Sequence, residues 1–241
     1  MKQNKSPVTV NERQPFFSAG SITVIAILTA ISLILYLFVK FPLPFIFPSW
    51  LDFQISDLPA LLGGFALGPV AGAVIIVLKC CLKMLFGLSS TANVGELADI
   101  LVGIAFVVPA AIIYSKFRSK KSAIAGLAVG TASAVVVSVL ANAFVLIPFY
   151  TKSFGMEAIV GMVQALYPNV NGDNFLAYYL PLAVAPFNIL RCVLSGVLTY
   201  LVYKPLSKAL HWNGKVHQKP SDADNGDNKS DATGVDCTDN K

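Results

Sequence analysis

The stretch LAVAPFNILRCVLSG, residues 182–196, decides the class of this protein because it places an arginine inside a long apolar run. Arg191 lies three residues after Asn188, and apolar residues flank both of them. A helix turns side chains at this spacing to the same face. In a soluble protein that face could lie in water, so the first question is whether the chain is soluble.

Composition answers that question. Of the 241 residues, 55% are hydrophobic and 13% are charged, whereas a typical soluble domain has about 25% charged residues. Six of the 13 acidic residues follow Asn213, and we expect none of the others to lie centrally in a long apolar stretch. Apolar runs of about 18 residues or more are typical of transmembrane helices. The composition therefore predicts an all-α integral membrane protein.

The apolar runs and the turn signals between them predict a compact bundle of six transmembrane helices. Their approximate limits are residues 18–40, 57–67, 69–87, 95–115, 122–149 and 177–204. Gly68 permits a chain reversal and Pro69 suits the first turn of a helix, which separates the second span from the third. One kinked helix over 58–86 is the alternative. Residues 41–57 contain three prolines and should form an extended loop.

This prediction divides the chain into an N-terminal arm (1–17), the six-helix domain (18–205) and a polar, largely disordered tail (206–241). Residues 150–177 should include an amphipathic surface segment. With six spans, the basic residues of the arm, of the 116–121 turn and of the segment after the last span fall on one side of the membrane. Positively charged loops favour the cytoplasm, so both termini are expected to be cytoplasmic.

Arg191 lies near the middle of the last predicted span. A central arginine costs about 2.5–3.5 kcal/mol on insertion scales, and we expect no mid-span carboxylate to neutralise it. It should therefore reach either an internal pocket or, through water, an external face. Asn188 points the same way, and Asn142 is another polar residue among apolar neighbours, so the three could form one patch inside the bundle. Such a patch could bind the edge of an uncharged or electron-rich heteroaromatic ring. Interhelical hydrogen bonding is the alternative for these residues.

Small residues recur every four positions at Gly64, Gly68 and Gly72, at Gly126 and Gly130, and at Ala26 and Ala30. This spacing lets helix backbones approach closely in a membrane. Internal packing is the simpler interpretation of these pairs, and docking of a second membrane subunit is the alternative.

Several functional motifs are absent from the sequence. It has no P-loop, nucleophile elbow or H-E-x-x-H, and its four cysteines lack metal-binding spacing. We therefore expect neither an enzyme nor a cofactor or metal site, and nothing indicates a nucleic-acid partner. A membrane-embedded binding protein without a motor suggests a partner that supplies the energy.

Four blocks, in order along residues 18–205, resemble a known family. They are FPLPFIFPSWLDFQISDLPALLGGFALGPVAG, NVGELADILVG, NAFVLIPFY and APFNILR. Together they resemble the riboflavin-specific substrate-binding (S) component of energy-coupling factor (ECF) transporters, the RibU family. The chain departs from the family at Arg191, where lysine is usual, and at Asp99, where the family has asparagine.

The resemblance implies a bacterial cell-membrane protein that captures riboflavin, as a transported ligand, from outside. It implies partners, namely one coupling membrane subunit and two ATP-binding subunits. Asn142, Asn188 and Arg191 would contact the flavin ring, Ala26 and Ala30 would dock on the coupling subunit, and the 41–57 loop would act as an extracellular lid. An S component for thiamine, biotin or folate, a structural membrane protein and an intramembrane enzyme remain the alternatives.

Overall fold

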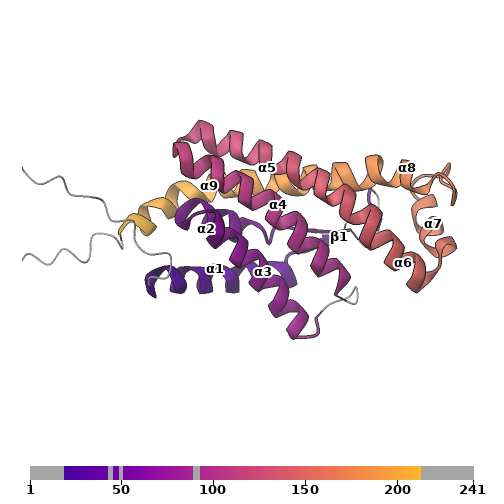
Figure 1. Cartoon of the computed structure of the whole chain (residues 1–241), viewed down its shortest axis with the longest axis horizontal. Coiled ribbons are helices and arrows are strands. Elements are labelled where there is room, and N and C mark those ends of the chain that lie inside the picture. Colours follow the sequence, from indigo (N-terminus) through magenta and orange to yellow (C-terminus); the bar gives the residue numbers. More distant parts are fainter. Residues whose placement is uncertain (1–18, 43–45, 49–50, 89–92, 213–241) are drawn as a thin grey trace, which may run out of the picture.

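Apolar helices make up most of the protein in a computed structural model that describes residues 19–42, 46–48, 51–88 and 93–212 (Figure 1). The helices are α1 (Ala19–Phe38), α2 (Leu58–Leu67), α3 (Pro69–Leu85), α4 (Val94–Phe117), α5 (Lys120–Ala141), α6 (Ile147–Phe154), α7 (Met156–Gln164), α8 (Phe175–Tyr179) and α9 (Ala185–Trp212). Strands β1 (Lys40–Pro42) and β2 (Asp52–Gln54) pair antiparallel. Residues 206–212, predicted as the start of the tail, belong to α9. The predicted arm (1–17) and the remainder of the predicted tail (213–241) lie outside the described residues.

Four helical segments are long and apolar enough to cross a membrane, judged by length and composition within the described part of the chain. They are Ala19–Phe38, Val94–Phe117, Lys120–Phe154 and Phe175–Val202. The apolar helix α2 has only 10 residues and α3 has 17. An all-α membrane protein is thus consistent with the structure, and the count of six spans stays a prediction.

The chain reverses at Gly68, which separates α2 from α3 as two helices. Gly68 has φ of 107°, a conformation that side chains other than glycine rarely adopt. Pro69 then begins α3, where its missing N–H group costs no helical hydrogen bond. The predicted split is correct, and the alternative of one kinked helix is wrong.

Two π-helical turns lie inside the longest helical segments. They are η1 (Asn142–Leu146), between α5 and α6, and η2 (Leu180–Val184), between α8 and α9. Each ends two residues before a proline, Pro148 or Pro186. A proline cannot complete the regular helical bond pattern, and a wider turn accommodates it without ending the helix. Such π turns are frequent at functional sites.

Four of the small residues, Gly64, Gly72, Gly126 and Gly130, lie where two helices pack closely. An added Cβ atom would meet Val107 at Gly64 and at Gly72, and the carbonyl groups of α4 at Gly126 and Gly130. α4 and α5 therefore pack with little space between their backbones. Internal packing explains these pairs, whereas Gly68 serves the turn.

The end of the molecule at the right of Figure 1 is formed by α6, α7 and α8, and β1 lies nearer the middle of the molecule. α7 is amphipathic, as predicted for this region, because Ile159, Val160 and Val163 are buried while Glu157 is exposed. The hairpin side chains Phe47 and Phe53 pack edge-on against Phe187 of α9, with ring centroids 5.3 and 6.1 Å apart. These contacts place the hairpin over the functional-site candidate described next.

Candidate functional site

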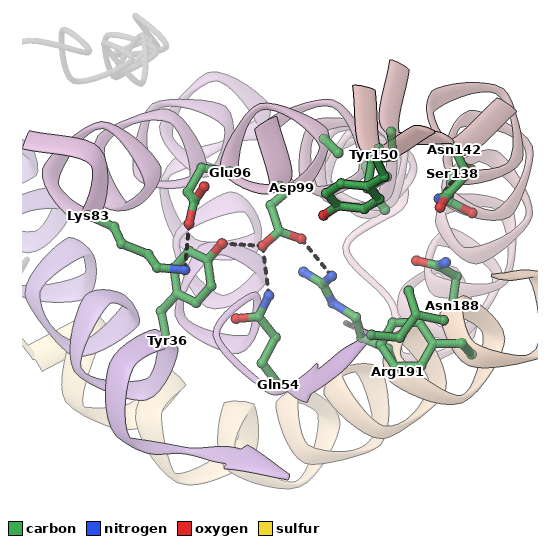
Figure 2. A pocket seen from close by; sticks show the side chains of 16 residues that line it. Tyr36, Gln54, Lys83, Glu96, Asp99, Ser138, Asn142, Tyr150, Asn188 and Arg191 are labelled. Atoms are coloured by element: carbon green, nitrogen blue, oxygen red, sulfur yellow. Dashed lines mark hydrogen bonds and ion pairs between the residues drawn. The ribbon is translucent and has the colours of Figure 1, made fainter. Parts of the chain in front are cut away.

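A cavity of about 100 Å³ lies between α1, the hairpin, α4, α5–η1 and α9 (Figure 2). Its polar lining residues are Tyr36, Gln54, Lys83, Glu96, Asp99, Ser138, Asn142, Tyr150, Asn188 and Arg191. Leu51, Val102, Leu146 and Phe187 contribute apolar walls. The three side chains predicted from the sequence thus line one cavity, Asn142 from η1 and both Asn188 and Arg191 from α9.

The amides of Asn142 and Asn188 lie at one side of this cavity (Figure 2). Asn142 donates through Nδ2 to the carbonyl of Ser138 (2.8 Å), and Asn188 donates to that of Val184 (2.9 Å). The Oδ1 atom of Asn142 also accepts from the hydroxyl of Tyr179 at 3.1 Å. Each amide is therefore held in a fixed orientation beside a π turn. In both residues, the Nδ2 group donates one hydrogen bond to a backbone carbonyl four residues earlier in the same helical segment.

Arg191 does not lack carboxylate partners, so that expectation was wrong. Its Nη1 atom lies 2.8 Å from Oδ1 of Asp99 on α4, and its Nη2 atom lies 2.9 Å from Oδ2 of Asp57, which precedes α2. The Arg191 side chain is 5% exposed. A buried cation needs such partners because burial removes its hydration. The sequence separations, 92 and 134 residues, explain why no local pattern indicated them.

Two lysines of α3 extend the ion pairs into a larger cluster. Nζ of Lys79 lies 2.5 Å from Asp57 and donates to Oγ of Ser56 at 2.8 Å. Nζ of Lys83 lies 2.8 Å from Glu96. Nζ of Lys83 also lies 3.8 Å from the ring centroid of Tyr36, a distance suited to a cation–π interaction.

The cluster is electrically balanced. It contains three cationic side chains (Lys79, Lys83, Arg191) and three carboxylates (Asp57, Glu96, Asp99). Within the described ranges, every buried charged residue belongs to it. Because opposite charges are equal in number, the cluster carries no net charge when all six groups are ionised. The four charged residues of the cluster that line the cavity, Lys83, Glu96, Asp99 and Arg191, are balanced as well.

Asp99 joins four elements of the fold at this site. Its Oδ1 atom accepts from Arg191 of α9. Its Oδ2 atom accepts from Nε2 of Gln54 in β2 at 2.7 Å and from the hydroxyl of Tyr36 in α1. Figure 2 shows these bonds converging on the carboxylate. Asp99 therefore fixes the cavity wall to α1 and to the hairpin.

Lys79, Lys83, Glu96 and Tyr36 were not among the site residues predicted from the sequence, although a signal for the charged ones was present. Lys79 and Lys83 lie four residues apart inside a predicted span, so they share one helix face. Glu96 and Asp99 lie three residues apart at the start of the next helix. Matching pairs of opposite charge in neighbouring spans indicate a buried ionic cluster, because neither pair is stable alone in an apolar environment.

Ala26 and Ala30 lie on the opposite side of α1 from this cluster. Both are exposed, whereas Ser32 and Tyr36 of the same helix are buried. The exposed face also carries Ile27 and Ile31. The outward-facing side of α1 therefore carries small and apolar side chains.

Comparison with known proteins agrees with this architecture. The family described as "ECF transporter, substrate-specific component" matches residues 20–203. The riboflavin transporter RibU of Staphylococcus aureus (strain TCH60) is 34% identical over 210 residues, which cover 87% of this chain and 94% of that protein. The riboflavin transporter FmnP of Bacillus subtilis (strain 168) is 25% identical over 197 residues, which cover 81% and 96%.

A solved structure described as the S component of a bacterial ECF transporter superposes with a TM-score of 0.60 at 33% identity. The similarity covers 79% of this chain and 97% of that one. The relatives span the predicted membrane domain almost completely and are named as transporters. The chain therefore belongs to the family of substrate-specific components of ECF transporters.

Proposed function

We propose that this protein captures riboflavin from outside the cell in the cavity beside Arg191. It then passes the vitamin inward together with an ATP-driven module of one coupling membrane subunit and two ATP-binding subunits. The names of the two bacterial relatives support the choice of riboflavin, and the family supports the ECF partners.

The observation that carries the choice of ligand is the balanced charge of the cavity wall. Riboflavin is uncharged at neutral pH, and its ring carries carbonyl oxygens, ring nitrogens and an N–H group. Fixed amides such as Asn142 and Asn188 can pair with both kinds of edge. Thiamine is a cation, whereas biotin and folate are anions. A charged ligand would require an opposite charge from the wall to offset its desolvation.

Part of the 41–57 segment is suited to act as a lid. Ligand sites for molecules of this size usually measure about 300–1,000 Å³, and the cavity measures about 100 Å³. A flavin can enter only if the wall moves. Leu51 and Gln54 line the cavity from the hairpin side, so outward movement of this segment would both enlarge the cavity and open it.

The proposed orientation places both termini in the cytoplasm. The start of α1, the turn between α4 and α5 and the end of α9 lie at the same end of the molecule in Figure 1. The turn carries Lys116, Arg118, Lys120 and Lys121, all of them exposed. This cytoplasmic end would face the ATP-binding subunits, and Ala26 and Ala30 would contact the coupling subunit within the membrane.

Binding can be tested with the purified full chain in detergent, after removal of any flavin carried over from the cells. Riboflavin fluorescence should be quenched with one site per chain. Asn188→Ala should weaken binding by about tenfold, the value of one hydrogen bond of about 1.4 kcal/mol. Lys152→Met, a change at an exposed residue of α6, serves as the matched control. Absence of quenching in folded protein would reject riboflavin as the ligand.

A further inference from the structure

Asp99 differs from the other carboxylates of the cluster in its access to the cavity. Its side chain is 14% exposed, whereas those of Asp57 and Glu96 are 3% and 2% exposed. Asp57 does not line the cavity, and of the two carboxylates that do, Asp99 is more exposed than Glu96. A charge at this position acts on a bound ligand with little intervening water, and low solvent content strengthens the interaction.

Asp99 also determines what Arg191 can offer to a ligand. A guanidinium group binds anions best as a fork, through two parallel N–H bonds. In this protein both terminal nitrogens of Arg191 already hold carboxylates, Asp99 and Asp57. The remaining N–H groups include Nε, which is buried and has no hydrogen-bond partner among the described residues. Arg191 thus keeps a buried N–H donor that no described residue pairs with, while its positive charge is offset.

We infer that Asp99 is a specificity-determining residue that makes the cavity select uncharged ligands over anionic ones. The inference rests on the proposed function, and it deepens that function. Riboflavin and its 5′-phosphate, FMN, share one ring system and differ by a group with about two negative charges. Asp99 disfavours the phosphorylated form by repelling it and by occupying Arg191.

The size of the effect follows from the charge balance. Asp99→Asn removes one negative charge and leaves three cations against two carboxylates, a net charge of +1. At a separation of about 10 Å and an effective dielectric constant of about 20, one unit charge changes the affinity for each ligand charge by roughly tenfold. Riboflavin carries no charge, so this electrostatic interaction does not change its affinity.

The experiment measures the ratio of the Kd for FMN to the Kd for riboflavin, by fluorescence quenching of both probes with the full chain. Asp99→Asn should lower the ratio by about a hundredfold, roughly tenfold for each of the two phosphate charges. Asp99→Asn/Arg191→Gln, which restores charge balance, should bring the ratio back toward that of the wild type. Glu157→Gln removes an exposed carboxylate of α7 and should leave the ratio unchanged, because surface charges are screened.

An unchanged ratio in folded Asp99→Asn would overturn the inference. If that variant does not fold, Arg191→Gln is compared with the double variant. The single variant has a net charge of −1 and should raise the ratio, and the double variant should reverse the rise. Equal ratios in these two proteins would overturn the inference. If the wild-type protein does not bind riboflavin, both the proposed function and the inference are rejected. If it binds riboflavin but the FMN-to-riboflavin Kd ratio does not depend on residue 99, only the inference is rejected.

Discussion

Arg191 of α9 and Asp99 of α4 form an ion pair of 2.8 Å at the wall of the cavity, across 92 residues of sequence. The pair joins the two parts of the site: the amides of Asn142 and Asn188 lie on one side of it, and Lys83 with Glu96 lies on the other (Figure 2). The proposed ligand site and the ion pairs that join the helices therefore share the same charges.

Arg191→Lys should retain the charge and weaken riboflavin binding less than Arg191→Ala does. A lysine ammonium is a point charge and lacks the planar fork that holds two carboxylates at once. Arg191→Ala removes charge-assisted bonds worth about 1.5–3 kcal/mol each, which corresponds to roughly 10- to 150-fold in Kd for one bond to the ligand. Titration of both variants with riboflavin gives their Kd values and shows which variant binds more weakly. Equal, wild-type affinity in both folded variants would exclude Arg191 from the site.

Lys79→Met should destabilise the protein strongly although it adds an apolar residue to an apolar helix. Lys79 is fully buried against Asp57, and removal of one partner of a buried pair costs about 3–5 kcal/mol. Thermal unfolding in detergent measures the loss. The control Lys152→Met, at an exposed position, should change stability by no more than about 0.5 kcal/mol. Similar unfolding temperatures for the two variants would show that the cluster contributes little.

Ala30→Leu should leave riboflavin binding intact and impair uptake by the complete transporter. Ala30 is exposed on α1, away from the cavity, and a larger side chain would prevent close approach of a second membrane helix. Binding is measured on the purified protein and uptake in vesicles that contain the whole complex. Loss of binding in the isolated variant would instead indicate that this face of α1 supports the fold.

Gly126→Ala should destabilise the bundle, whereas Gly161→Ala should not. A Cβ atom at Gly126 would lie 2.7 Å from the carbonyl oxygen of Ala110, and at Gly161 it would meet nothing within 4 Å. Overpacking costs about 1–3 kcal/mol, and alanine in an open helical position gains up to about 1 kcal/mol over glycine. Unfolding temperatures distinguish the two outcomes. An unchanged value for Gly126→Ala would mean that α4 and α5 can separate without cost.

Much of the fold could be predicted because its signals are local. The length of the apolar runs indicates the long helical segments, α1 and α4 among them. The pair Gly68-Pro69 indicates the reversal between α2 and α3. The π turns had a partial signal in Pro148 and Pro186, but a proline inside an apolar run also fits a kink or a helix end. The choice between these depends on packing that a single segment does not contain.

The site could be predicted only in part. Asn142, Asn188 and Arg191 stand out because each is polar among apolar neighbours, and the structure brings them to one cavity. The error concerned Asp57 and Asp99, which lie near the ends of predicted spans and look like ordinary interfacial acids. Their contact with Arg191 depends on how deeply α2 and α4 sit relative to α9. That relative depth follows from tertiary packing, for which sequence periodicity carries no signal.

The most direct test of the account is a parallel binding measurement with four labelled vitamins on one sample of wild-type protein stripped of ligand. A cavity with a balanced charge predicts tight binding of riboflavin, with one site per chain, and no measurable binding of thiamine, biotin or folate at the same concentrations. If a charged vitamin binds and riboflavin does not, the result contradicts both the choice of riboflavin as the ligand and the charge argument that supports this choice.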